Sequence, residues 1–174
     1  MEIVKVKKVH EDAVIPTKAY PSDAGFDLYA LEDVIVESGD TEKIRTGLSF
    51  DLPSGYEMQI RPRSGVSLKT SLRVTFGTVD CDYRGEVAVI VDNINQETDA
   101  YCDGVLETTD GIIQVQSDEY RKYLDGTYII RKGDRIAQAV IQQIPHITLV
   151  EVIKLSNGAR GGNGFGSTGI NHEY

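Results

Sequence analysis

Residues 77–87 (Gly-Thr-Val-Asp-Cys-Asp-Tyr-Arg-Gly-Glu-Val) place acids, an aromatic ring and an arginine on a predicted tight turn between two β-rich stretches. Asp80 has the chemistry of a general base that orients a water molecule, although an aspartate in a turn can equally cap backbone amides. Asp82 competes for the same role. Tyr83 suits either a core position or a platform beneath a sugar. The segment therefore predicts a pocket for a small polar ring beside a water-activating carboxylate.

Two further segments carry donors for an anion. Arg63, Ser64 and Gly65 combine a guanidinium, a hydroxyl and open backbone, which suits a phosphate site or an ordinary turn. Residues 160–168 are glycine-rich and end in a serine and a threonine, with part of the spacing of a phosphate-binding P-loop. The P-loop lysine and its strand-loop-helix setting are missing, so a P-loop nucleotide triphosphatase is disfavoured. Residues 160–168 therefore fit one of two interpretations: a segment whose backbone amides approach phosphate oxygens, or a mobile tail.

The elements that must position these residues are mostly short strands. Apolar and β-branched residues recur in short runs, partly alternating with polar ones, with turns at 53–55 and 133–134. Little helix is expected beyond one or two turns at 65–70. Many short strands with turns between them predict an all-β sandwich or barrel. The expected strands are 3–7, 33–37, 46–52, 56–60, 87–91, 136–141 and 149–153.

Length and charge narrow the function classes. The chain has 174 residues, enough for one domain with a sizeable core, and a net charge of -9. An acidic protein is a poor general nucleic-acid binder, so no direct nucleic-acid contact is expected. No apolar run approaches the ~20 residues that cross a bilayer, and the N-terminus lacks a signal-peptide pattern. We expect no membrane association, a cytoplasmic location and reduced thiols at Cys81 and Cys102.

Residues 95–126 differ from the rest of the chain. They contain eight acidic and two basic residues, and therefore most of the net negative charge. An Asp-Gly pair predicts a hairpin turn at 109–112, and residues 117–124 are expected to form a short helix capped by Ser117. The segment is too short to bury a core of its own, so we interpret it as an insertion into the β domain.

Residues 156–174 form a glycine-rich tail with few apolar side chains, which should be mobile by itself. Phe165 is the exception, because a single aromatic ring in such an arm is unexpected unless it packs against another surface. The scattered histidines show no metal-ligand spacing, and no Ser-His-Asp constellation is visible.

Five short motifs, taken in order, resemble those of the trimeric dUTP nucleotidohydrolases (dUTPases). Each motif is weak alone, but together they extend over nearly the whole chain in the order typical of that family, and the combination is highly specific. The motifs are Ala24–Leu28, Arg61–Gly65, Gly77–Val87, Gly133–Gln138 and Arg160–Gly169.

The resemblance implies a single domain, 1–174, with a jelly-roll-like β-barrel that forms a homotrimer. Each active site would be built from several subunits, and the C-terminal arm of one subunit would close over a site formed by the others. Phe165 would stack on uracil, with Gly166 also contacting the substrate. Arg160, Ser167 and Thr168 would hold the terminal phosphates.

The implied reaction is hydrolysis of dUTP to dUMP and pyrophosphate, which removes dUTP and supplies dUMP for dTTP synthesis. Asp80 would activate the water that attacks the α-phosphorus in line, with Gln138 as the second catalytic residue. Mg²⁺ would bridge the three phosphates and be held mainly by them and by water. Asp27 would at most reach the ion indirectly.

The resemblance also implies the substrate contacts. Arg63, Ser64, Gly65 and Gln138 would contact the phosphate chain. Tyr83 would pack under the deoxyribose and leave no room for a 2′-hydroxyl. Backbone groups around three residues would pair with the uracil edge, and such a pocket rejects cytosine because the wrong base leaves buried groups unpaired. Those three residues are Gly77, Val79 and Ala88.

Two features depart from the family pattern. Phe76 stands where smaller residues are usual, and is expected to tighten or reshape the base pocket. Residues 95–126 are extra, and comparable inserts occur in dUTPases of phages that infect Gram-positive bacteria, some of which also bind a transcriptional repressor. The acidic, tyrosine-containing insert fits either docking onto a basic partner face or a solvated loop that binds nothing.

Three other functions compete with dUTP hydrolysis. A dCTP deaminase of the same fold superfamily would need a positioned glutamate and a different second motif. A regulatory repressor-binding module with secondary or lost catalysis is disfavoured by the intact Asp80, Tyr83 and Arg160, which leave room for a second role. A purely structural jelly-roll protein explains none of the five motifs.

Overall fold

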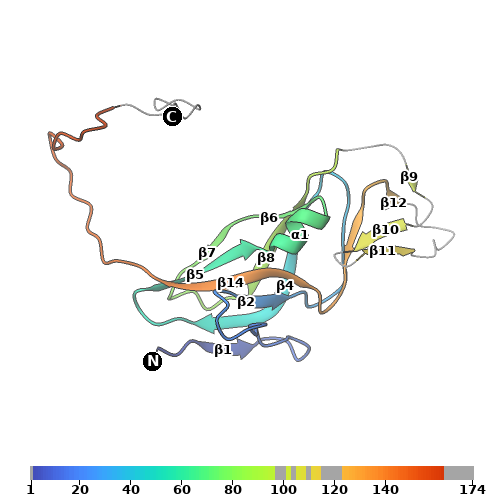
Figure 1. The fold of residues 1–174 in the computed structure, drawn as a ribbon. Helices are drawn as coiled ribbons and strands as arrows, with labels where there is room; N and C mark the ends of the chain where they lie inside the picture. Colours follow the sequence, from blue (N-terminus) through green and yellow to red (C-terminus); the bar gives the residue numbers. More distant parts are fainter. Residues whose placement is uncertain (1, 97–100, 103–104, 109–110, 115–122, 163–174) are drawn as a thin grey trace.

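The computed structural model describes residues 2–96, 101–102, 105–108, 111–114 and 123–162, which are predominantly β (Figure 1). Within these ranges the strands form three four-stranded sheets and one two-stranded ladder, accompanied by a single short helix, α1 (Ser64–Lys69). The expected all-β class and the expected helical turn near 65–70 are confirmed. No helix in this part of the chain is both long and apolar enough to cross a membrane.

The first sheet has the order β1-β4-β8-β6 and is antiparallel throughout. Val87, Val89 and Val91 of β8 are buried, as expected for alternate residues on the core face of a strand. The β4–β8 register shifts between Arg45 and Leu48, which marks a β-bulge. The strands are β1 (Lys5–Lys8), β4 (Thr41–Asp51), β6 (Leu72–Val74) and β8 (Val87–Asn93).

The second sheet has the order β2-β14-β5-β7 and is also antiparallel. Because β14 lies in the interior of the sheet, Gln138 pairs with Asp27 of β2 on one side and Arg61 of β5 on the other. Parts of four of the five motifs therefore meet on this sheet. Its strands are β2 (Phe26–Tyr29), β5 (Tyr56–Pro62), β7 (Gly77–Val79) and β14 (Arg135–Gln143).

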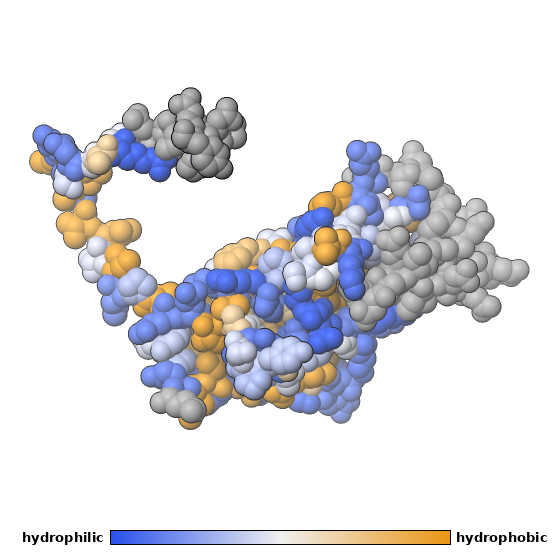
Figure 2. Space-filling view, in the orientation of Figure 1, coloured by the Kyte–Doolittle hydropathy of each residue, from blue (hydrophilic) through white to orange (hydrophobic). Residues whose placement is uncertain are grey.

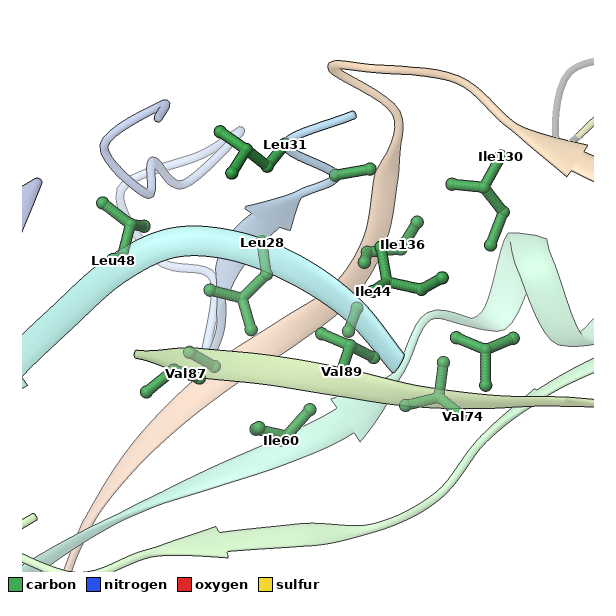
Figure 3. Packing of buried hydrophobic residues seen from close by; sticks show 14 of the residues in the cluster. Leu28, Leu31, Ile44, Leu48, Ile60, Val74, Val87, Val89, Ile130 and Ile136 are labelled. Atoms are coloured by element: carbon green, nitrogen blue, oxygen red, sulfur yellow. The ribbon is translucent and has the colours of Figure 1, made fainter. Parts of the chain in front are cut away.

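One continuous apolar core lies between these two sheets. Figure 3 shows Val87 and Val89 of β8 beside Ile60 of β5, with Leu28 and Ile136 nearby, and all five belong to the buried cluster. Full burial of a branched apolar side chain contributes about 1.5–3 kcal/mol relative to exposure. The shared core therefore fixes the relative positions of the strands that carry the motifs.

A third sheet, with the order β11-β10-β13-β3, stands beside the main body (Figure 1). Thr108 pairs with Gly111 across β10 and β11, which confirms the hairpin predicted at 109–112; residues 109–110 lie outside the described residues. β10 joins the sheet through a parallel contact with β13. The strands are β3 (Val34–Val36), β10 (Val105–Thr108), β11 (Gly111–Gln114) and β13 (Tyr128–Ile130).

The helix predicted over 117–124 is wrong at its C-terminal end. Tyr123 and Leu124 form β12 (Tyr123–Leu124), which pairs antiparallel with β9 (Tyr101–Cys102). Tyrosine fits a paired strand well, and here the partner comes from the other end of the segment. Residues 117–122 lie outside the described residues.

The chain after β14 runs away from the sheets. Residues 144–162 form no strand, so the strand predicted at 149–153 is wrong. A strand needs a hydrogen-bonding neighbour, and the described residues supply none here. Leu149 and Ile153 are fully or almost fully exposed, and Figure 2 shows apolar residues along this segment.

Candidate active site

A polar hollow of about 470 Å³ opens where the second sheet meets α1. Residues far apart in the sequence line it because β14 lies between β2 and β5, and β5 leads directly into α1. Asp27, Arg63, Ser64, Gly65 and Gln138, all predicted as site residues, are among its walls. The other lining residues are Ala19, Asp23, Ala24, Gly25, Val66, Lys69 and Arg135.

Asp27 lies between two arginines in this hollow. Its Oδ1 is 3.0 Å from Arg63 Nε and its Oδ2 is 3.4 Å from Arg135 Nη1, and the side chain is only 13% exposed. Arg63 also donates from Nη1 to the Arg135 carbonyl oxygen at 2.9 Å. Because both carboxylate oxygens already face guanidinium groups, Asp27 orients the two arginines.

The protein groups of the hollow do not by themselves form a magnesium cage. Within the described ranges, no group of three His, Cys, Asp or Glu side chains could hold a metal ion. Mg²⁺ in phosphate-processing sites commonly takes one or two carboxylates together with substrate phosphates and water. The donor set therefore fits an ion that arrives with a phosphorylated substrate.

Two glycines of the hollow have different roles. Gln138 donates from Nε2 to the Pro62 carbonyl oxygen at 2.9 Å and lies against Gly25. A Cβ on Gly25 would be 2.5 Å from Gln138 Oε1, so the close approach needs glycine. A Cβ on Gly65 would meet nothing within 4 Å, so Gly65 leaves open space at the wall of the hollow.

Eight residues of the segment 77–88, together with Ile60, line a second hollow of about 280 Å³. β7 pairs with β5, so Gly77 faces Ile60 at a distance that leaves little room for a side chain. Val79 and Ala88, which the resemblance places at the base, also line this hollow. Phe76, expected to reshape the pocket, is 56% exposed and is not part of this lining.

Asp80 and Tyr83 lie on a tight turn that borders the second hollow. The Tyr83 amide donates to the Asp80 carbonyl oxygen at 3.2 Å, and Tyr83 Oη donates to the Glu86 carbonyl oxygen at 3.1 Å. The Asp80 carboxylate makes no ion pair or hydrogen bond with the part of the chain that the structure describes. Asp82 does not line the hollow, so the geometry favours Asp80 over Asp82 as the base.

The two hollows share no lining residue. In one copy of the chain, the predicted base-binding and phosphate-binding residues therefore belong to different cavities. Arg160 lines neither; it lies in the tail, on a turn closed by the Gly161 amide and the Gly158 carbonyl oxygen. Phe165, Gly166, Ser167 and Thr168 lie outside the described residues.

Two cations of the first hollow are absent from the sequence prediction. Arg135 is the first residue of β14, directly after the Gly133-Asp134 turn, and so lies at the same strand end as Gln138. Lys69 follows Gly65 by one helical turn in α1, a spacing that places both on one face. Arg135 lies within the motif Gly133–Gln138, and Lys69 follows the motif Arg61–Gly65, so the sequence pointed to the neighbourhood of both residues.

The dUTPase family model matches residues 11–104 and 124–169 of the chain. The chain belongs to the dUTPase family. The match omits residues 105–123, which lie within the acidic segment. The deoxyuridine 5′-triphosphate nucleotidohydrolase of Helicobacter hepaticus is 38% identical over 169 residues, covering 96% of this chain and 89% of the relative. The Clostridioides difficile enzyme is also 38% identical, covering 96% and 98%.

Solved dUTPases of staphylococcal phages have the same fold as this member of the family. A phage 80alpha dUTPase variant with dUpNHpp has a TM-score of 0.88 and 31% identity, covering 98% of this chain and 100% of the phage chain. The phage phi11 dUTPase, in which a species-specific insert was visualised, has a TM-score of 0.81 and 31% identity, covering 90% and 99%. A phi11 variant with a TM-score of 0.82 and 30% identity, covering 89% and 99%, revealed the coordination of a structural Mg(II) ion.

Proposed function

We propose that this dUTPase hydrolyses dUTP to dUMP and pyrophosphate. One observation carries the proposal: the Asp80 carboxylate, without a partner among the described residues, borders a hollow lined by residues of β7 and β8. That is the arrangement needed to hold a base by its edge and to direct a water beside it. The first, arginine-lined hollow has the chemistry of a phosphate site.

The base and sugar would occupy the hollow formed by residues 77–88. Peptide groups around Gly77, Val79 and Ala88 belong to paired strands, so they cannot rotate to suit a different ring. Cytosine presents donors where uracil presents acceptors, and would leave these groups unpaired. Tyr83, held by its bond to the Glu86 carbonyl oxygen, would pack under deoxyribose and exclude a 2′-hydroxyl.

The phosphate chain would occupy the first hollow. Arg63, Ser64, Gly65 and Gln138 would contact it, with the Arg63 guanidinium already oriented by Asp27. Guanidinium groups suit phosphate oxygens because they offer several donors in a plane. The open space at Gly65 would let phosphate oxygens approach the backbone.

Mg²⁺ would be held mainly by the phosphates and by water, with Asp27 acting through the arginines or a bridging water. Bound in this way, the ion neutralises charge on the phosphates during transfer. Asp80 would accept a proton from the water that attacks the α-phosphorus in line. As that bond forms, the bond from the α-phosphorus to the bridging oxygen breaks and pyrophosphate leaves.

A homotrimer would complete the site, since one chain keeps the two hollows apart. Two surfaces support association between copies: the exposed apolar side chains of 147–155 and an apolar groove of about 310 Å³ beside β1, which Val4, Val6 and Phe26 help to line. Exposed apolar surface of this kind commonly marks an interface.

The tail 156–174 would act as a closing arm over the assembled site. Phe165 would stack on uracil, Gly166 would contact the substrate, and three donors would hold the terminal phosphates. The position of residues 144–162 outside the sheets supports this role, because the tail is then available to another copy. The three donors are Arg160, Ser167 and Thr168.

Pyrophosphate release from dUTP, dTTP, dCTP and UTP, each with and without Mg²⁺, tests the proposal. We expect Mg²⁺-dependent release from dUTP alone. Release of ammonia from dCTP would favour the deaminase alternative. If every nucleotide stayed intact, the proposed activity would be wrong and a binding role would replace it.

We also propose a second function for residues 95–126, as an acidic docking segment for a transcriptional repressor protein. The gap in the family match at 105–123 and the likeness to a phage dUTPase with a species-specific insert support a segment added to the catalytic domain. Its excess of acids would attract the basic face of a DNA-binding protein.

A deletion that preserves the base of the insert tests docking. Asn93 and Asn95 donate to the Gly126 carbonyl oxygen, at 3.0 and 2.8 Å, and Ser38 donates to that of Asp125. Residues 97–122 should therefore be replaced by a short glycine-serine linker that leaves these bonds intact. We expect unchanged dUTP hydrolysis and lost repressor affinity. Unchanged affinity for every repressor of the host would end the docking proposal.

A further inference from the structure

The loop 80–86 between β7 and β8 is attached to the first sheet by side chains of β4 that do not line the second hollow. Ser49 of β4 donates from Oγ to the Arg84 carbonyl oxygen at 2.8 Å. Arg84 forms an ion pair with Asp51 of β4, and its Nη1 donates to the Cys81 carbonyl oxygen at 2.7 Å. Four alternate positions of β4 therefore take part in holding this loop: Arg45, Gly47, Ser49 and Asp51.

Glu86 makes the most extensive of these attachments. Its Oε1 accepts from Arg45 Nε at 3.2 Å and from the Gly47 amide at 2.8 Å, and its Oε2 accepts from Arg45 Nη2 at 3.1 Å. The Glu86 side chain is 26% exposed and that of Arg45 is 40% exposed. Two nitrogens of one guanidinium on one carboxylate give a bidentate pair, which fixes orientation as well as distance.

The Gly47 amide reaches Glu86 because β4 is bulged there. Arg45 pairs with Ala88 and Leu48 pairs with Val87, so the two residues of β4 between them have no paired residue on β8. Gly47 has a φ of 69°, a conformation that glycine adopts without strain. The bulge turns the Gly47 amide away from the ladder and toward the Glu86 carboxylate.

Burial and hydrogen bonding act on Glu86 in opposite directions. Burial alone would raise the pKa of the Glu86 carboxyl, but the hydrogen bonds from Arg45 and the Gly47 amide, together with the Arg45 charge, lower it. The residue therefore stays ionised at neutral pH, and its attachment to β4 is charge-assisted.

Glu86 is also one of the residues that line the second hollow. Its carbonyl oxygen accepts the hydrogen bond from Tyr83 Oη, and the next two residues, Val87 and Ala88, line the hollow with it. The carboxylate is thus fixed to β4 on one side, while the carbonyl oxygen holds the Tyr83 ring on the other. A shift of Glu86 would move the proposed sugar platform and the proposed base edge together.

We propose that Glu86 is a positioning residue for substrate selection, and that Arg45 and the Gly47 bulge of β4 act through it. The inference rests on the proposed function, because the nucleotide it concerns is the one assigned to the second hollow. Arg45 touches no part of that hollow, so its effect on the substrate passes through the Glu86 carboxylate. The selection concerned is deoxyribose against ribose, which depends on the Tyr83 ring.

Glu86→Gln tests the proposal with little change in volume. The amide keeps an acceptor for Gly47 but presents an uncharged group to Arg45, so the bidentate pair is lost. We expect the ratio of kcat/KM for dUTP to that for UTP to fall about tenfold, mainly through a higher KM for dUTP, since misplacement by ~1 Å can cost up to about a hundredfold. Loss of folded protein alone would lower both values equally and leave the ratio unchanged.

Arg45 variants probe the same contact from the other side. Arg45→Gln should reproduce the Glu86→Gln ratio, and the double variant should be no worse than either single one, because both remove one interaction. Arg45→Lys should recover part of the ratio, since an ammonium restores the charge without the second parallel bond. These variants also serve if Glu86→Gln proves too unstable to purify.

Asp12→Asn is the matched control. Asp12 pairs with Lys132 at 2.9 Å on the surface, and neither residue lines a hollow. The Asp12→Asn variant should lose a comparable ion pair and keep the wild-type ratio of kcat/KM for dUTP to that for UTP. If Glu86→Gln and Arg45→Gln both kept it too, the positioning role would be overturned.

Binding of dUpNHpp and of UTP, measured by calorimetry without turnover, separates this inference from the proposed function. If wild-type protein prefers the deoxynucleotide but hydrolyses nothing, the proposed activity fails, and the binding preference of Glu86→Gln still decides the inference. We expect the variant to lose that preference. If wild-type protein shows no preference at all, selection by the Tyr83 ring and positioning by Glu86 are both wrong.

Discussion

At the scale of single residues, the surroundings of two aspartates separate their roles. Asp27 is 13% exposed and lies between the guanidinium groups of Arg63 and Arg135. Asp80 is exposed, has no side-chain partner among the described residues, and borders the hollow proposed for the base. A carboxylate whose two oxygens already face guanidinium groups has no free oxygen for a water, whereas an unpaired carboxylate beside the hollow can orient one.

Asp80→Asn should lower kcat for dUTP by at least about a hundredfold, because general-base catalysis typically contributes 10²–10⁴-fold. Affinity for dUpNHpp should stay within about threefold of wild type, since the amide keeps the shape of the carboxylate. Pyrophosphate release and calorimetry measure the two quantities. Asp82→Asn, the matched control, should retain near-wild-type turnover. Normal turnover by Asp80→Asn would remove Asp80 as the water activator.

Several surface carboxylates make stability depend on pH. The Lys132 amide and the Arg131 side chain lower the pKa of Asp33 from 3.8, and hydrogen bonds from Arg45 and Gly47, opposed by burial, lower that of Glu86 from 4.5. A lowered native pKa gives stability that is complete above the ordinary value and is lost as pH falls through the native one.

We therefore expect the free energy of unfolding to decrease as pH is lowered from about 5 toward 2, with little change between pH 6 and 8. Urea unfolding followed by circular dichroism at each pH measures this. Glu86→Gln should show a shallower decrease than wild type, because one of the contributing groups is gone. An equal slope in the two proteins would mean that Glu86 adds nothing to acid sensitivity.

At the scale of elements, the strands β14 and β4 both position the site, but the sequence predicts a site residue only on β14. β14 pairs with both β2 and β5, and so collects Asp27, Arg63 and Gln138 around one hollow. β4 carries no predicted site residue. It nevertheless holds the 80–86 loop through its bulge and through the side chains of Arg45, Ser49 and Asp51. The alternation of β4 and β14 predicted strands, but pairing partners depend on residues distant in the chain.

Truncation after Leu155 is expected to separate folding from catalysis. The described strands and both hollows lie before that residue, so thermal unfolding should change little. Hydrolysis of dUTP should fall at least about a hundredfold, because the proposed arm that orders the substrate is gone. Phe165→Ala in the full chain should give a smaller loss, through the stacking ring alone. Full activity of the truncated protein would refute arm closure.

At the scale of the whole molecule, the single chain presents apolar surface that folding does not bury. Leu149 is 94% exposed and Ile153 is fully exposed, in a segment that the sequence pattern predicts as a strand. Burying such side chains contributes about 1.5–3 kcal/mol each, so contact with another copy would be strongly favoured. The predicted strand at 149–153 is absent from the single chain and would require a partner from another copy.

Leu149→Glu should weaken the proposed trimer, because a charge would replace an apolar side chain in the contact. Sedimentation velocity at low micromolar concentration should show wild-type protein at the mass of three chains and the variant shifted toward one. Val9→Glu changes an exposed residue outside the tail and should leave the mass unchanged. A wild-type mass of one chain would end the trimer proposal.

The sequence by itself determined the β class and the order of the five motifs, and it predicted candidate site residues that line the two hollows. These depend on local properties: alternation along a strand, turn chemistry, and the side chains that can bind phosphate or activate water. Six of the seven expected strands occur, as β1, β3, β4, β5, β8 and β14. Five of them have small shifts at their ends, whereas β4 begins at Thr41, well before the predicted start at 46.

Only the tertiary structure decided which of these residues share a cavity. It paired Asp27 with two arginines, added Arg135 and Lys69 to the same hollow, and kept Asp80 and Tyr83 in another. It also showed that 149–153 pairs with no other described segment and that Tyr123 lies in a strand. Each of these outcomes depends on contacts between distant segments, which no local pattern specifies, because strand pairing and ion pairing are set by the packed core.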